Sequence, residues 1–285
     1  CHRDPAENYR QKGAGAVKKK RILSDIIVYA LLSVAALFTL LPLLMALMNS
    51  FKSNQELLIN VLSWPTELRL ENYVRTFDKM HYLRSFLNTV LLSGLSVSLM
   101  ILFSALAGWK LCRTKTRLSR SLLKLFIFSM LIPFSSIMIP LYRVTQSMNI
   151  TNSLVGLSFV YAGLGVSMAI FLYHGFVKSI PVELEEAAAI DGCSSSQVFF
   201  KIVFPMLKPI TAAITITNVL WIWNDFLLPL IMISDNKKYT LLGQYSSDWT
   251  AILSALILAA LPVIVFYAFF QKRILKGISD GAVKG

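Results

Sequence analysis

Six long apolar stretches alternate with polar, charge-bearing segments along the chain. They fall near residues 26–48, 86–109, 122–141, 154–175, 210–233 and 251–270. A helix needs about 20 apolar residues to cross ~30 Å of hydrocarbon, and a segment in lipid must pair its own backbone polar groups. The alternation of apolar and polar residues that barrel strands would need is not visible. The pattern therefore predicts an all-α membrane protein with six transmembrane helices.

Composition agrees with this pattern, and the charge distribution adds an orientation. Hydrophobic residues make up 55% of the chain and the net charge is +13, which by itself would also suit a nucleic-acid-binding protein. If the N-terminus is inside, however, 19 of the 28 basic residues lie in cytoplasmic segments and only 8 lie outside. This asymmetry is typical of the positive-inside rule. Both termini are predicted to be cytoplasmic, and the clusters at residues 18–21 and 110–120 are interpreted as topological anchors.

The ends of the chain and its cysteines support three further expectations. The first span is too long for a signal peptide, and no small-residue cleavage site follows it, so we expect it to be retained. Cys1 is not a native initiator, which indicates a processed or engineered start. Cys112 and Cys193 fall in predicted cytoplasmic segments, where a disulfide framework is not expected. The predicted organisation is a basic cytoplasmic segment (1–24), a six-helix membrane domain (25–271) containing a patterned loop (179–209), and a cytoplasmic tail (272–285).

The loop 179–209 predicts two short helices joined by a glycine turn. Pro181 suits a first helical turn, and the three glutamates at 183, 185 and 186 suit the positive end of a helix dipole. Gly192 stands where a helix would stop in a left-handed cap. Ser194 and Gln197 have the spacing of a capping box for a second helix.

That second helix would pass through an aromatic and aliphatic run, and Pro205 and Pro209 would break it before the fifth span. Small residues at Ala187 and Ala188 would let another backbone approach closely. An amphipathic hairpin that rests on the lipid surface is the alternative interpretation of the same pattern.

The residues of this loop resemble the EAA loop of ABC importer permeases. Glu186-Ala187-Ala188, followed by Asp191-Gly192 and later by Ile202-x-x-Pro205, carries the resemblance. The stretch from Trp223 to Leu230 is similar to the fifth-span signature of carbohydrate permeases, and residues 281–285 resemble their C-terminal tail. The chain is thus similar to the shorter, G-type subunit of maltose-type systems. It departs from that pattern after Leu241, where the run that precedes residues 243–249 is shortened, so the resemblance does not imply a direct contact between this outer segment and a sugar.

The resemblance implies a mechanical role without catalysis. It identifies Glu186, Ala187, Ala188, Asp191 and Gly192 as the contact through which a separate ATPase moves the membrane bundle by alternating access. The implied location is the bacterial cytoplasmic membrane. The implied partners are a second homologous permease, two ATP-binding subunits that hold ATP and Mg²⁺, an extracytoplasmic solute-binding protein, and a sugar or oligosaccharide.

Polar residues inside the spans are candidates for the substrate path, because an ionisable group in a membrane helix is costly and usually serves a function. Asp225 is the sharpest case. At helical spacing it would share one face with Asn218 and Trp221, next to Asn224, and this face could hold a sugar by hydrogen bonds and aromatic stacking. A polar contact between helices explains the same residues equally well. Asn88 is a weaker candidate.

Several other functions are disfavoured by what the sequence lacks. It contains no phosphate-binding loop, no Cys/His metal spacing and no serine elbow, so we expect no ATPase or other enzyme site and no cofactor in this chain. An ion-coupled secondary transporter would need more mid-membrane charges than Asp225 alone, and a membrane enzyme or scaffold has less support. An ABC importer permease for a non-sugar solute remains the main alternative.

Overall fold

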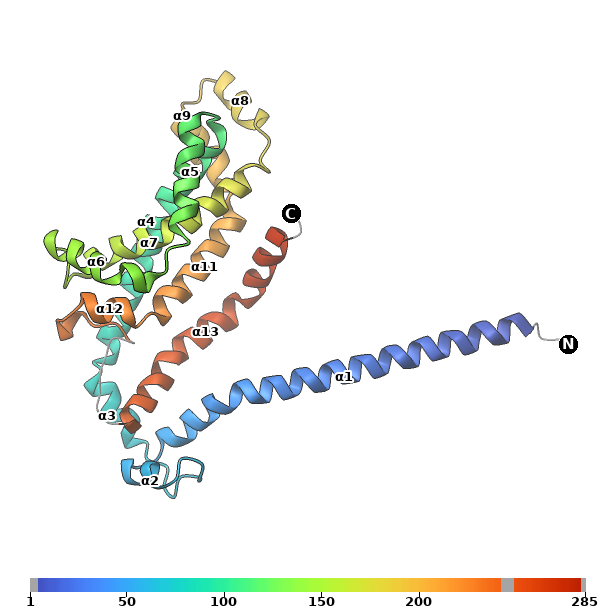
Figure 1. Cartoon of the computed structure of the whole chain (residues 1–285), viewed down its shortest axis with the longest axis vertical. Helices are drawn as coiled ribbons and strands as arrows, with labels where there is room; N and C mark the ends of the chain where they lie inside the picture. The colour runs from blue at the N-terminus through green and yellow to red at the C-terminus, as the bar shows by residue number, and fades with distance from the viewer. Residues whose placement is uncertain (1–4, 242–248, 283–285) are drawn as a thin grey trace. The chain divides into compact units, whose positions relative to one another are not determined.

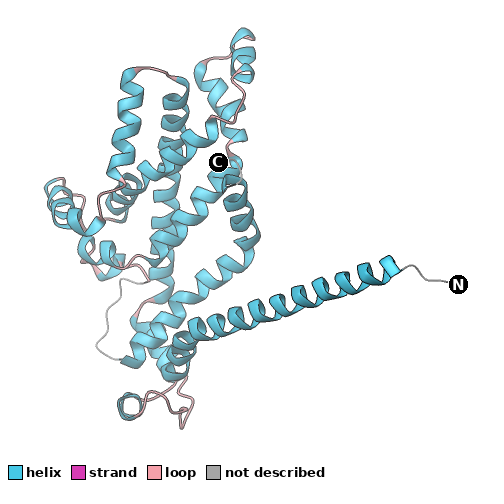
Figure 2. Cartoon of the chain, turned by 45° about the vertical axis from the view of Figure 1, so that its right-hand side comes forward, coloured by secondary structure: helices cyan, strands magenta, loops and turns pink. Residues whose placement is uncertain are grey.

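Four long helices dominate the structure, a computed structural model that describes residues 5–241 and 249–282 (Figures 1 and 2). Side chains are described from residue 24 to residue 271, apart from residue 236 and the gap at 242–248. The long helices are α1 (Pro5–Ser50), α4 (Tyr82–Arg113), α7 (Leu154–Val177) and α13 (Trp249–Ala282). Each contains an apolar stretch long enough to cross a membrane. The predicted first, second, fourth and sixth spans are therefore confirmed as continuous helices.

Shorter helices connect these four. On either side of α4 lie α2 (Asn54–Ile59), α3 (Glu71–Lys79), α5 (Arg117–Ser129) and α6 (Phe134–Ser147). Between α7 and α13 lie α8 (Glu183–Ile190), α9 (Ser195–Val198), the π-helical turn η1 (Phe199–Val203), α10 (Phe204–Met206), α11 (Lys208–Asn224), α12 (Leu227–Met232) and the 3₁₀ turn η2 (Asn236–Lys238). The described residues contain no strand, as the all-α prediction requires.

The third and fifth predicted spans are not single helices; a kink at Pro133 is expected from the sequence, whereas the end of the fifth helix at Asn224 is not. The third is divided into α5 and α6, which meet at 105° across a break that ends at Pro133. Pro133 is extended, with ψ 140°, and its missing N–H cannot continue the ladder of α5. The fifth ends at Asn224, nine residues early, and α11 is joined to the preceding loop helices at a bend of 73°. Six spans result only if each bent pair counts as one.

The chain divides into two compact units. One comprises Cys1–Asn72 with Asp248–Ile257, and the other comprises Tyr73–Ser247 with Leu258–Gly285. In the first unit, the buried Lys52 ammonium donates to the carbonyl of Asn60 at 2.9 Å, and the Asn72 amide donates to the carbonyls of Ser50 and Lys52, both at 2.8 Å. Burial of a lysine is tolerated here because backbone oxygens replace its hydration.

The core of the second unit is the crossing of α4 and α7. Gly108 permits a close approach: a Cβ at this position would lie 2.7 Å from the Cβ of Tyr173 and 3.0 Å from the backbone nitrogen of His174. One buried apolar cluster surrounds Tyr173 and extends into α8, α9 and η1. A second surrounds Tyr161 and extends into α12. Tyr173 also donates a 2.9 Å hydrogen bond to Thr211 on α11, so three helices are held together beside the loop.

Candidate functional site

The loop after α7 is a helical hairpin, as predicted. The helix α8 ends before Gly192, whose φ of +83° is the left-handed conformation expected of a glycine cap. Ser194 and Gln197 then form the predicted capping box: the Ser194 N–H donates to Oε1 of Gln197 at 2.8 Å, and the Gln197 N–H donates to Oγ of Ser194 at 3.4 Å. Pro181 is the exception, because α8 begins two residues later, at Glu183.

The inner side of α8 is bound to the C-terminal end of α4 through Glu185. Arg113 Nε donates to Glu185 Oε1 at 2.8 Å, and Trp109 Nε1 donates to Glu185 Oε2 at 2.9 Å. Arg113 also donates from Nη2 to the carbonyl of Ile180, at 2.8 Å, just before the hairpin begins. The Arg113 and Glu185 side chains are only 21% and 11% exposed, so solvent screens this ion pair less than a surface pair.

The second arm of the hairpin packs against the same part of α4. The rings of Trp109 and Phe199 lie 5.2 Å apart, and Phe199 is 1% exposed. Val198 and Val203 are buried beside it. Phe199 is also the first residue of the π-helical turn η1, a local widening that is often found at functional positions. Both arms therefore rest on α4.

The outer side of the hairpin is open. Glu186, Ala187, Asp191 and Gly192 are exposed, whereas Ala188 is buried in the apolar cluster with Phe199. Ile190, which lies between Ala188 and Asp191 in the sequence, is 85% exposed, and this is unusual for a large apolar side chain. Four of the five predicted coupling residues thus lie on the accessible side of the hairpin, and the fifth faces the bundle. Their role in binding an ATPase remains a prediction.

Sequence reasoning missed the three residues that attach the hairpin to the bundle. Glu185 was interpreted only as a partner of the helix dipole, and Arg113 only as part of a topological charge cluster. The available signal was the spacing of four between Trp109 and Arg113, which puts both on one face of the helix. Nothing in the sequence identifies Glu185, rather than Glu183 or Glu186, as their partner.

Asp225 is not on a helix face, which corrects the prediction for the fifth span. It follows the last residue of α11 in an extended conformation, with ψ 123°. One carboxylate oxygen accepts a 2.8 Å hydrogen bond from the buried Tyr161 hydroxyl, and the other accepts from the N–H groups of Leu227 and Leu228 at the start of α12. Asp225 therefore stabilises the break between α11 and α12, as in the alternative interpretation of a contact between helices.

The other path candidates are separated by the structure. Asn218 donates to a carbonyl of its own helix at 2.8 Å, and Asn88 donates to the carbonyls of Lys237 and Tyr239, both at 3.0 Å. Trp221 is 40% exposed and packs edge-on against Tyr161, with ring centroids 5.4 Å apart. Asn224 is exposed. Trp221 and Asn224 are thus the path candidates that offer accessible surface.

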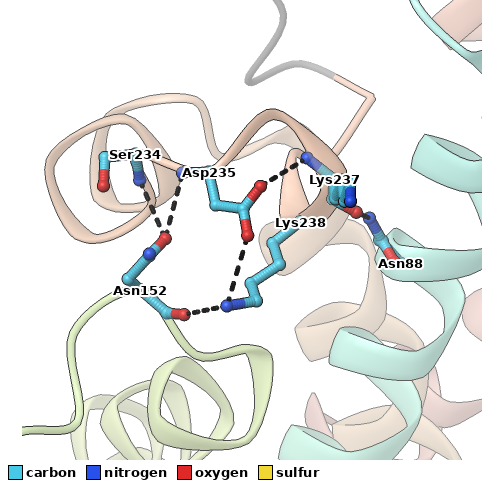
Figure 3. A network of polar contacts seen from close by, with 6 residues as sticks. All are labelled: Asn88, Asn152, Ser234, Asp235, Lys237 and Lys238. Carbon is cyan, nitrogen blue, oxygen red and sulfur yellow. Dashed lines mark hydrogen bonds and ion pairs between the residues drawn. The ribbon is translucent and has the colours of Figure 1, made fainter.

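A polar network fastens the segment after α12 (Figure 3). Asn152 accepts at Oδ1 from the N–H groups of Ser234 and Asp235, at 3.2 and 3.0 Å, and its carbonyl accepts from Lys238 at 2.9 Å. The Lys237 N–H, with smaller contributions from Lys238, lowers the pKa of Asp235. Residues 242–248, where the shortened run after Leu241 and most of the segment 243–249 fall, and the tail residues 283–285 lie outside the described part of the chain.

Comparison with known proteins identifies the architecture. Residues 100–280 match the family described as binding-protein-dependent transport system inner membrane component. The chain belongs to this family. Its members are ABC importer permeases, so the resemblance to ABC importer permeases that the sequence indicated is confirmed. The chain is a multi-pass membrane component, as the apolar helices also indicate.

Individual relatives of this permease cover nearly its whole length. It is 37% identical over 88% of its length to a probable starch degradation products transport system permease protein, AmyC, of Thermoanaerobacterium thermosulfurigenes, 94% of which is covered. It is 33% identical over 94% of its length to the melibiose/raffinose/stachyose import permease protein MelC of Bacillus subtilis, all of which is covered. A bacterial ABC transporter involved in the import of alginate shares the fold, with a TM-score of 0.74, 22% identity, and coverage of 89% of this chain and 97% of that one.

Proposed function

We propose that this chain is one of the two permease subunits of an ATP-driven sugar importer that depends on an extracytoplasmic binding protein. Several relatives that match nearly the whole chain are named as sugar or starch-product permeases, which supports a carbohydrate substrate. ATP and Mg²⁺ would be held by a separate ATPase pair, and this chain would supply no catalytic group. Both of its termini would lie in the cytoplasm.

The observation that carries the coupling role is the two-sided hairpin. Its inner side is packed on α4, and its outer side exposes Glu186, Asp191 and the apolar side chain of Ile190. A rigid projection with a small apolar centre and a charged rim is suited to insertion into a cleft of another protein. We propose that the cleft belongs to the ATPase, and that its closure moves the hairpin and switches the bundle between inward-facing and outward-facing states.

We further propose that Trp221 and Asn224 contribute to the path. The indole offers an apolar face on which a sugar ring can stack. The Asn224 amide donates one N–H to the carbonyl of Leu220 at 2.8 Å, which leaves its oxygen and its second N–H for a ligand. Asp225, Asn218 and Asn88 are assigned a structural role instead, because their side chains bind Tyr161 or backbone groups and are less exposed than Trp221 and Asn224.

Reconstitution of the assembled complex with its binding protein tests this function. ATP hydrolysis should rise when the binding protein is loaded with raffinose or maltotriose and stay basal with histidine. Glu186→Arg should abolish the stimulation and release the ATPase from the membrane, whereas Glu183→Arg, on the same helix, should do so much less. Uptake driven by a proton gradient in this chain alone, or stimulation by histidine and not by either sugar, would refute the proposal.

A further inference from the structure

A clamp of three side chains joins the hairpin to the membrane bundle. We propose that Trp109, Arg113 and Glu185 are positioning residues that make α8 and the C-terminal end of α4 move as one body. The inference rests on the proposed coupling function, because it concerns how a force applied to the hairpin reaches the bundle. Without the clamp, the segment between α7 and α8 would bend and absorb the displacement.

Both oxygens of Glu185 are used by α4. Oε1 accepts from Arg113 and Oε2 accepts from Trp109, and Arg113 reaches in addition to the carbonyl of Ile180. Charge-assisted hydrogen bonds of this kind are shorter and stronger than neutral ones. Since both charged side chains are mostly buried, separating them would leave two poorly solvated charges. The contact therefore resists opening under load.

Trp109 connects the clamp to the other arm of the hairpin. Its N–H group binds Glu185 on α8, and its ring lies 5.2 Å from that of Phe199, where η1 begins. One side chain of α4 thus contacts both arms of the hairpin. A turn held at both arms by one helix cannot swing without moving that helix.

The clamp lies next to the closest approach of α4 and α7. Gly108, adjacent to Trp109, has no space for a Cβ against Tyr173. Tyr173 in turn donates to Thr211 on α11. Displacement of α8 can therefore pass through α4 to α7 and α11 by contacts between packed side chains, which is a physically continuous route.

Neighbouring glutamates on α8 point in different directions and have different roles. Successive residues of an α-helix point about 100° apart. Glu185 is directed to α4, while Glu183 and Glu186 are exposed. The EAA-type motif begins at Glu186, so the clamp residue precedes the residues proposed to touch the ATPase. Substitution of Glu185 should consequently weaken the transmission of movement while the docking surface stays intact.

Distance measurements in the assembled complex test the clamp. Spin labels would be attached at Lys110 on α4 and Ala189 on α8, both exposed, after all three cysteines, Cys1, Cys112 and Cys193, are replaced by alanine. Pulsed electron-spin measurements would compare the nucleotide-free complex with the complex trapped by ATP and vanadate. In the unsubstituted clamp we expect one narrow distance distribution that is the same in both states.

Glu185→Gln and Trp109→Phe should broaden this distribution or shift it on trapping. Both should also lower binding-protein-stimulated ATP hydrolysis by about tenfold, the effect of losing one charge-assisted hydrogen bond, with the ATPase still bound. Glu183→Gln, the matched control, should change neither. If one variant prevents assembly, the other decides, because Trp109→Phe keeps both charges and the aromatic contact with Phe199.

A narrow and unchanged distribution in the assembled clamp variants would overturn the inference, as would an equal effect of Glu183→Gln. So would a distance in the unsubstituted complex that already changes on trapping. Failure of the proposed function has a different signature: Glu186→Arg would then leave the ATPase bound and stimulated, whatever the clamp variants do.

Discussion

Gly192 sets the angle between the two arms of the hairpin through its backbone. Its φ of +83° is disfavoured for residues with a side chain, and a Cβ at this position would meet no atom within 4 Å. The cost of Gly192→Ala is therefore backbone strain alone, about 1–2 kcal/mol. We expect hydrogen exchange of residues 183–204 to accelerate accordingly in the purified complex.

Gly94 provides the matched control for this prediction. It also has free space around its Cβ position, but it lies within α4, where alanine is favoured. Gly94→Ala should be neutral or stabilising by roughly 0.5–1 kcal/mol. Equal exchange rates in the hairpin of Gly192→Ala and of the unsubstituted protein would contradict the assigned role of the glycine.

Tyr161 and Asp225 show why a residue type alone did not reveal its role. A carboxylate in an apolar window suggests a substrate site, yet here it accepts from a tyrosine and caps the start of α12. Tyr161→Phe removes a hydrogen bond to a carboxylate and should destabilise the complex by about 1.5–3 kcal/mol. A lower thermal unfolding temperature would show this.

The control is Tyr267→Phe on α13, where the tyrosine side chain is 49% exposed and removal of the hydroxyl should leave the unfolding temperature unchanged. Retention of full stability by Tyr161→Phe would mean that the contact with Asp225 is weak, and the path interpretation of Asp225 would regain support.

At the scale of elements, the sequence was informative wherever the signal was local. The four continuous spans, the glycine turn and the capping box depend on composition and on residues a few positions apart, and all were predicted. The bend between α5 and α6 lies at Pro133, where a kink is expected from the sequence, but its angle of 105° and the early end of α11 were not predicted. Apolar content is the same in a straight and in a bent segment, and the end of α11 depends on a tertiary contact, the hydrogen bond from Tyr161 to Asp225.

The clamp of the hairpin was missed for the same reason. Glu185 and Arg113 are separated by 72 residues, and no pattern along the chain connects them. Only the packing of α4 on α7 brings them together. The exposed side of the hairpin, in contrast, could be predicted from its motif, because that motif is contiguous.

The α4–α7 crossing can be tested by filling its closest point. Gly108→Ala would place a Cβ 2.7 Å from the Cβ of Tyr173 and 3.0 Å from a backbone nitrogen, and neither neighbour is a flexible side-chain end. Overpacking of this kind costs about 1–3 kcal/mol. We expect a lower thermal unfolding temperature and weaker stimulation of the ATPase.

Gly175→Ala is the corresponding control on α7, since a Cβ there would meet nothing within 4 Å. It should leave both measurements unchanged. Should Gly108→Ala be as stable as Gly175→Ala, the two helices must be able to separate at this point, and the proposed route of force from α4 to α7 would lose its stiffest contact.

At the scale of the whole molecule, the orientation in the membrane should depend on a few basic clusters. Lys18, Lys19, Lys20 and Arg21 immediately precede the first span, and positive charges within about 15–20 residues of a span have the most influence on its insertion. Replacing these four by glutamine should allow a measurable fraction of N-termini to reach the outer side. A phosphatase reporter fused to the N-terminus, active only outside, would measure that fraction.

Neutralising Lys237 and Lys238 tests the same rule from the other side. These two residues are predicted to lie outside, so their loss should increase the charge asymmetry and leave the reporter inactive. An N-terminal reporter that is already active in the unsubstituted protein would require the opposite orientation. The hairpin and its exposed Glu186 would then lie on the side of the membrane opposite the cytoplasm, and no ATPase in the cytoplasm could reach them. The coupling mechanism therefore depends on the topology of the whole chain.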